Sequence, residues 1–157
     1  MINGVQSKQL IRHPDERGFF EEILRETDPI FSGEFGQLSR SSMHEGVVKA
    51  WHIHTSQIDW WHVITGTVKV ALYDTRVGSK TYKELAEFLL GDGASDVVLK
   101  IPPGVAHGLK VIHGPAELIY VTSGVYRKDE EGRIPYDDSA IGYDWVQGME
   151  ITNKNIT

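Results

Sequence analysis

The chain has 157 residues, of which 40% are hydrophobic, and carries a formal net charge of −6 at pH 7. This length fits one domain, residues 1–157, with its own core. The acidic balance argues against binding to nucleic acid or to an anionic membrane. The absence of cysteine excludes disulfides and thiolate metal ligands. Because no stretch resembles a signal peptide or approaches 18 apolar residues, we expect a soluble, cytoplasmic protein.

Short apolar runs separated by glycine-containing turns recur along the chain and predict many strands. Enrichment in Trp, Tyr, Val and Ile favours strands over helices, and helical periodicity is weak everywhere except around residues 83–88. These runs predict an all-β fold, a sandwich or jelly-roll barrel. Residues 127–139 are expected to form a surface loop, and residues 141–145 a short return to the body. The predicted strands are 18–26, 35–43, 47–54, 59–66, 67–74, 86–91, 96–101, 107–113 and 116–126.

A cluster of histidines is the main chemical signal. His52 and His54 are two residues apart in one strand and therefore point to the same face, which the neighbouring Val48 and Ala50 indicate to be the barrel interior. Asp59 opens the next strand and can lie opposite this pair.

Further along the chain, the turn 102-PPG-104 delivers His107 onto another strand. His62 has the opposite strand parity to Asp59 and is interpreted as an outward or packing residue. The spacing H-x-H-x4-D-x6-G, followed by P-x-G-x2-H, resembles the two motifs of the cupin superfamily, with aspartate in place of the usual glutamate.

This resemblance implies a double-stranded β-helix, or jelly-roll barrel, in which His52, His54, Asp59 and His107 bind one divalent metal. Three imidazoles and a carboxylate suit Zn, Fe, Mn or Ni without selecting among them. The alternative is that the same groups are hydrogen-bonded side chains of an ordinary barrel interior.

The chain also resembles the dTDP-4-dehydrorhamnose 3,5-epimerase family along nearly its whole length. That family removes protons beside the ketone of a nucleotide-linked 4-keto-6-deoxy sugar and returns them on the other face, without a required cofactor. Such chemistry needs a base, an acid on the opposite face and a group that stabilises the enolate. The stretches that carry the resemblance are 15-DERGFFEE-22, 37-QLSRSS-42, 49-KAWH-52, 73-YDTRVGSKTY-82, 101-IPPGVAHGLKV-111, 119-IYVTSGVY-126 and 136-YDDSAIGYDW-145.

The resemblance assigns roles to individual residues. It places the catalytic histidine at His52, a second active-site histidine at His107 and the catalytic tyrosine at Tyr120. Positions that match the family's substrate-binding residues are Arg17 and Lys49 for the phosphates, Glu22 and Gln37 for the nucleotide base or its neighbourhood, and Tyr126 as a pocket aromatic.

Two departures from the family pattern concern charge. Asp59 stands where the family has a lysine that stabilises the enolate. A divalent ion at the histidines would restore positive charge, but it would use His52 as a ligand and leave proton transfer to Tyr120 or a metal-bound hydroxide. Asn155 stands where the family has an aspartate that pairs with the catalytic histidine, and an asparagine cannot raise the basicity of an imidazole as a carboxylate does.

Three functions follow as hypotheses. The first is a 3- and/or 5-epimerase or keto isomerase that acts on a nucleotide-activated 4-keto-6-deoxy sugar. The second is a metal-dependent cupin of another class, such as a dioxygenase or a small-sugar isomerase. The third is a non-catalytic barrel that binds a sugar or a nucleotide.

The resemblance further implies an assembly. The family forms dimers in which N-terminal strands cross between barrels, and the apolar segment 18–26 is suited to join a neighbour's sheet. We therefore predict a two-fold symmetric homodimer in which Arg17 or Glu22 reaches the partner's pocket.

Overall fold

The computed structural model describes residues 1–149, which form ten strands and no helix. The all-β prediction is confirmed, while the weak helical signal around residues 83–88 corresponds to a turn that leads into a strand. The strands are β1 (Gln6–Gln9), β2 (His13–Asp15), β3 (Gly18–Phe20), β4 (Gln37–Met43), β5 (Val48–His54), β6 (Asp59–Asp74), β7 (Leu85–Gly91), β8 (Val97–Ile101), β9 (Val105–Thr122) and β10 (Glu131–Arg133).

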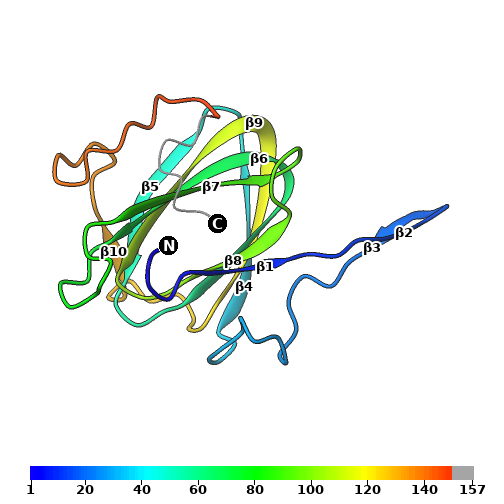
Figure 1. Ribbon diagram of the computed structural model, residues 1–157, viewed down its shortest axis with the longest axis horizontal. Coiled ribbons are helices and arrows are strands. Elements are labelled where there is room, and N and C mark those ends of the chain that lie inside the picture. The colour runs from blue at the N-terminus through cyan, green and yellow to red at the C-terminus, as the bar shows by residue number, and fades with distance from the viewer. Residues whose placement is uncertain (150–157) are drawn as a thin grey trace.

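Two long bent strands, β6 and β9, pair antiparallel along their whole length and take part in both layers of the jelly-roll barrel (Figure 1). The first half of β6 and the second half of β9 form one layer with β1, β8 and β4. The other halves form the second layer with β7, β5 and β10. Pairs of predicted strands, 59–66 with 67–74 and 107–113 with 116–126, are therefore single strands that bend.

The barrel interior is filled mainly by valine, leucine and isoleucine side chains from both layers. Two smaller apolar clusters cover the outside. One joins Trp60 and Val98 to the N-terminal segment through Leu10 and Ile30. The other joins Trp51 of β5 to Trp145 of the loop that follows β10.

A β-bulge in β5 changes which side chains face the interior. The pairing of β5 with β9 shifts register between Lys49 and His52. As a result Lys49 and both histidines of the strand line the interior cavity, whereas Val48 and Ala50 pack in the outer cluster with Trp51. The prediction that Val48 and Ala50 share the face of the histidines is wrong, because two consecutive outward residues at the bulge interrupt the alternation.

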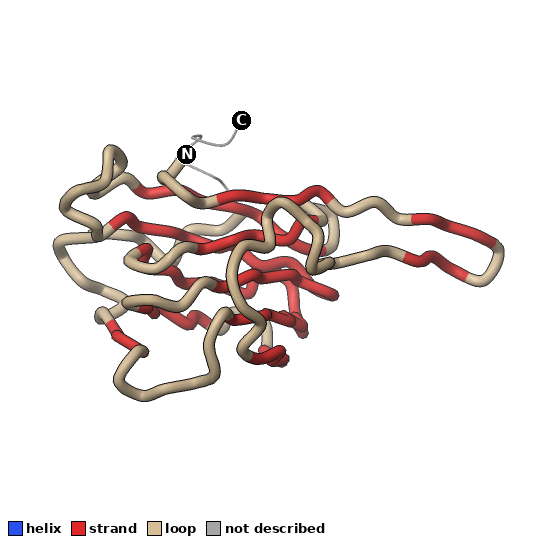
Figure 2. Tube along the Cα trace, turned by 90° about the horizontal axis from the view of Figure 1, so that it is seen from below, coloured by secondary structure: helices blue, strands red, loops and turns tan. Residues whose placement is uncertain are grey.

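The hairpin of β2 and β3 extends away from the barrel (Figures 1 and 2). Only Gly18–Phe20 of the predicted strand 18–26 is paired, and its partner is β2 rather than the barrel. Phe19 and Phe20 are 54% and 65% exposed. In residues 1–149 no helix is long and apolar enough to cross a membrane.

The bend in β6 depends on Gly66, which has a φ of +78°. A Cβ atom at this position would lie 2.8 Å from backbone atoms of His113, Pro115 and Ala116. We expect Gly66→Ala to lower the free energy of unfolding by roughly 1–3 kcal/mol, measured by urea denaturation. The matched control is Gly78→Ala, because Gly78 is exposed and a Cβ there would meet nothing within 4 Å. Equal effects of the two substitutions would contradict the prediction.

Candidate functional site

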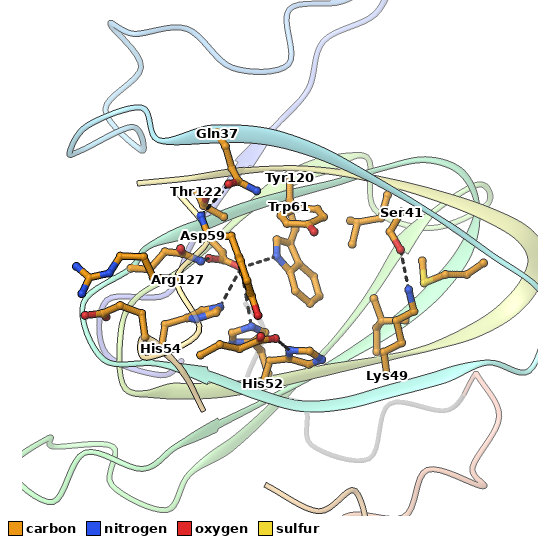
Figure 3. Close-up of a pocket in the computed structure, with 18 residues that line it drawn as sticks. Gln37, Ser41, Lys49, His52, His54, Asp59, Trp61, Tyr120, Thr122 and Arg127 are labelled. Carbon is orange, nitrogen blue, oxygen red and sulfur yellow. Dashed lines mark hydrogen bonds and ion pairs between the residues drawn. The ribbon is translucent and has the colours of Figure 1, made fainter. Parts of the chain in front are cut away.

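A cavity of about 200 Å³ opens inside one end of the barrel (Figure 3). Its lining combines apolar side chains with imidazole, carboxylate, hydroxyl and amide groups, which is the usual composition of a small-molecule site. The side chains that line it come from β4, β5, the turn between β5 and β6, β6, β9, β10 and the segment before β10. They are Gln37, Ser41, Met43, Lys49, His52, His54, Gln57, Asp59, Trp61, His107, Leu109, Leu118, Tyr120, Thr122, Tyr126, Arg127, Glu130 and Glu131.

His52 is paired with a carboxylate, that of Glu131, which neither the sequence motifs nor the family resemblance predicts. Its Nδ1 lies 3.0 Å from Glu131 Oε1. Burial lowers the pKa of His52, and the adjacent Glu131 partly opposes this shift. Burial acts to raise the pKa of Glu131, but the Arg133 guanidinium and hydrogen bonds from His52 and Tyr126 outweigh it, so this pKa lies below its ordinary value. Glu131 is therefore ionised at neutral pH and can only accept hydrogen bonds.

His107 is the most deeply buried histidine of the cavity, with 3% of its side chain exposed. Its Nδ1 lies 3.0 Å from the Val105 carbonyl oxygen, which can only accept, so Nδ1 carries the proton and Nε2 does not. Burial lowers the pKa of His107 to about 4, although Asp59 opposes the shift. His107 is therefore neutral at physiological pH.

Asp59 is a buried carboxylate whose two oxygens both accept hydrogen bonds. The Gln57 amide donates to Oδ1 at 2.9 Å and the Trp61 indole donates to Oδ2 at 3.1 Å. The same Oδ2 lies 3.8 Å from His54 Nε2 and 3.9 Å from His107 Nε2. Three of the four predicted metal ligands thus come together, and the fourth, His52, does not belong to this group.

Four further predicted pocket residues also reach the cavity, namely Tyr120, Lys49, Gln37 and Tyr126. Tyr120 lies on β9 opposite Trp61 of β6, and its side chain lines the wall across from His52 (Figure 3). Lys49 donates to the Ser41 hydroxyl at 2.8 Å. Gln37 accepts a hydrogen bond from the Tyr126 backbone amide at 2.8 Å, which fixes the segment that leads to β10.

Two predicted substrate-binding residues lie outside the cavity of their own chain. Arg17 is at the tip of the projecting hairpin, where it pairs with Asp15 and is 81% exposed. Glu22 follows the hairpin and contacts Arg25 at 3.5 Å. His62, as predicted, packs on the other side of β6, with its Nδ1 3.2 Å from the Val97 carbonyl oxygen. Asn155 lies outside the described residues.

Residues 127–131, predicted as part of a surface loop, contribute three side chains to the cavity. Arg127, Glu130 and Glu131 line the cavity because β10 pairs with β5. A three-residue strand is too short to show alternation, so polarity alone carries no sign of this pairing. The consecutive acids before Gly132 were the one available signal.

Comparison with known proteins decides the family. The sequence profile described as dTDP-4-dehydrorhamnose 3,5-epimerase matches residues 1–156. The chain belongs to this family. The spore coat polysaccharide biosynthesis protein SpsL of Bacillus subtilis (strain 168) is 43% identical over 148 residues, covering 92% of this chain and 97% of that protein.

Two solved structures of related proteins have the same fold as this chain. The crystal structure of a dTDP sugar isomerase from Desulfovibrio desulfuricans G20 matches with a TM-score of 0.87 at 33% identity and covers 92% of each chain. The epimerase dTDP-6-deoxy-D-glucose-3,5-epimerase of Legionella pneumophila Philadelphia 1, solved in complex with dTDP-4-keto-L-rhamnose, matches with a TM-score of 0.84 at 26% identity. That match covers 96% of this chain and 82% of the other. The epimerase-family resemblance and the cupin form of the barrel are thereby confirmed.

The buried His107 makes the stability of this epimerase-family barrel depend on pH. An unfolded histidine titrates near pH 6.5, whereas burial lowers the folded pKa to about 4. Between these values the unfolded state binds more protons, so stability is full above pH 6.5 and falls as the pH decreases toward 4. The shift corresponds to a loss of about 3 kcal/mol.

Urea denaturation of the native chain at pH 7.5 and pH 5 should show about 2 kcal/mol of this decrease, because pH 5 is still above the folded pKa. The His107→Asn chain should lose less stability between the two pH values, because it lacks the titrating group. Equal losses in both chains would contradict the assignment.

Proposed function

We propose that the chain is an epimerase or keto isomerase that acts on a nucleotide-activated 4-keto-6-deoxy sugar. The observation that carries the proposal is the placement of His52, held by Glu131, and Tyr120 on opposite walls of one cavity (Figure 3). Family membership and the keto-sugar complex of the Legionella relative support this substrate class.

The two groups can move protons in opposite directions. Because the ionised Glu131 accepts the Nδ1 proton of His52, Nε2 is the basic nitrogen of the ring. It removes the proton from the carbon beside the ketone, and the electron pair of that C–H bond becomes the enolate. The Tyr120 hydroxyl returns a proton to the same carbon from the other face, which inverts its configuration.

The remaining lining residues suit the two ends of such a substrate. Lys49 and Arg127 are the cations that line the cavity within residues 1–149. We assign Lys49 to the phosphates, because its Nζ is held by the Ser41 hydroxyl alone among the described side-chain contacts. Gln37 and Tyr126 lie together at the cavity and are assigned to the nucleotide.

The group of His54, Asp59 and His107 favours a second candidate, a metal-dependent cupin such as a dioxygenase or small-sugar isomerase. Both Nε2 to Oδ2 separations, 3.8 and 3.9 Å, are too long for hydrogen bonds, and these three donors have the chemistry to hold one Zn, Fe, Mn or Ni ion. A bound ion would polarise a ketone and stabilise an enolate. His52, outside this group, would stay available as the base.

The central test is proton exchange. Incubation with dTDP-4-keto-6-deoxyglucose in deuterated water should introduce deuterium at C3 or C5 of the sugar, measured by NMR. We expect His52→Asn to lower the exchange rate by roughly a hundredfold to ten-thousandfold, the usual contribution of a positioned base. The control is His113→Asn, because His113 is exposed and does not line the cavity.

The other outcomes separate the alternatives. Exchange that is lost with a chelator and restored by one of the four metals would favour the metal-dependent candidate. Tight binding of the sugar nucleotide without exchange would leave a non-catalytic binding barrel. Absence of exchange with every nucleotide keto sugar tested would refute the epimerase proposal.

We also propose that the chain forms a two-fold homodimer through the β2–β3 hairpin. An isolated two-stranded hairpin is marginally stable in water, and this one exposes Phe19 and Phe20. Paired with another barrel it would bury both rings. Arg17 and Glu22, which do not reach the cavity of their own chain, would then be available to the partner's cavity.

Light scattering should give about twice the 17.6 kDa of one chain at micromolar concentration. Phe20→Glu should shift the mass toward one chain, because it places a charge in the buried contact. The control Val77→Glu alters a residue that is 80% exposed in a loop of the barrel and should leave the mass unchanged. A native mass of one chain would overturn the dimer.

A further inference from the structure

We propose that Glu131 is a positioning residue for His52, whose carboxylate fixes the ring in the tautomer that leaves Nε2 free to accept the substrate proton. This inference rests on the proposed function, because it concerns how that reaction's base is prepared. Neither the motifs nor the family resemblance assigned Glu131 a role. It is identified by its contact with His52 inside the cavity.

Backbone pairing between β10 and β5 fixes the position of Glu131, which does not lie in an unpaired loop. β10 pairs with β5 so that Glu131 is opposite His54 and Arg133 is opposite His52. The ladder continues past β10, where Trp51 and Ile134 exchange two hydrogen bonds of 3.0 and 3.1 Å. Close approach of the strands is possible because Gly132 has no side chain: a Cβ there would lie 2.7 Å from Ile53 Cγ2.

The hydrogen bonds around Glu131 identify it as an acceptor. Arg133 donates to Oε1 at 3.3 Å, and the Tyr126 side chain also donates to the carboxylate. An acceptor with these donors around it requires the proton of His52 to be on Nδ1, so that Nε2 is unprotonated. Without Glu131, a neutral imidazole is free to adopt either tautomer and to rotate within the cavity.

The pair also lies where proton transfer would take place. The side chains of His52 and Glu131 are 31% and 17% exposed, and both line the cavity. His107, the neighbouring ring at 6.2 Å between centroids, is held separately by the Val105 carbonyl. The carboxylate of Glu131 therefore orients His52 and not His107, and its loss should affect the chemical step more than substrate binding.

Two substitutions of Glu131 should lower kcat to different degrees. Glu131→Ala removes the acceptor, whereas Glu131→Gln keeps the shape but presents either an amide oxygen or an amide donor, so it no longer specifies the tautomer. We expect kcat to fall in the order native, Gln, Ala, with an overall loss of roughly tenfold to a thousandfold and KM changed by less than about twofold. The matched control is Asp137→Asn, an exposed acid of the same segment that does not line the cavity.

A double substitution tests whether Glu131 acts through His52. In the His52→Asn chain, Glu131→Ala should cause no further loss of exchange, because the residue it positions is gone. Thermal melting checks that each variant is folded. A kcat of folded Glu131→Ala equal to that of the native chain, or a full additional loss in the His52→Asn chain, would overturn the proposal.

The tautomer can be observed without any substrate, which separates this inference from the proposed function. Nitrogen-15 NMR of the imidazoles, with His52 assigned by the signal that disappears in His52→Asn, should show Nδ1 protonated and Nε2 unprotonated in the native chain. Glu131→Ala should shift His52 toward a mixture of tautomers and leave His107 unchanged. A native His52 with its proton on Nε2 would refute the positioning role even if exchange were active, and the expected tautomer would support that role even without exchange.

Discussion

The full-length pairing of β6 with β9 is the constraint on which the rest of the molecule depends. The ladder runs from Asp59 opposite Thr122 to Asp74 opposite Val105, and both strands must bend at the same level for it to continue. Each strand therefore contributes to both layers, and the barrel closes around a cavity whose walls come from the two halves. Asp59 lies in one layer and His107 in the other, so their close approach is a result of the closure of the barrel.

The charges of the cavity are arranged with their partners already in place. Asp59 is buried, and an unsatisfied carboxylate there would be costly. The Gln57 and Trp61 donors satisfy it, while burial keeps His107 neutral. The interior is consequently rich in acceptors, and its cations, Lys49 and Arg127 among the described lining residues, come from β5 and from the segment before β10.

Spaced motifs located much of the candidate site from the sequence. His52, His54, Asp59 and His107 stand at fixed intervals, and the structure brings all four to one cavity. Tyr120 came only from the family resemblance, because a tyrosine in a strand is ordinary by itself. The strands with clear alternation or continuous apolar runs were likewise predicted, apart from the bends that join two of them into one.

The structural features that could not be predicted from the sequence depend on pairing between segments that are far apart along the chain. The bulge in β5 is a register shift against β9, and local polarity does not record it. Glu131 meets His52 because β10 adds to the free edge of β5, a contact of 79 residues in sequence separation. The predicted partner position was Asn155, whereas the carboxylate observed beside His52 belongs to a different segment.

The outer face of β9 has a consequence for interpreting inactivating mutations. Behind His107, Gly108 leaves room for Trp145, and a Cβ at Gly108 would lie 2.5 Å from Ala50 and 2.8 Å from the Trp145 ring. The strand that carries His107 is thus clamped from outside by a loop that never touches the cavity. A genetic screen for loss of function would recover substitutions on both faces of this strand. Mapped onto the structure, the recovered positions would extend through the barrel wall and would not be confined to the residues that line the pocket.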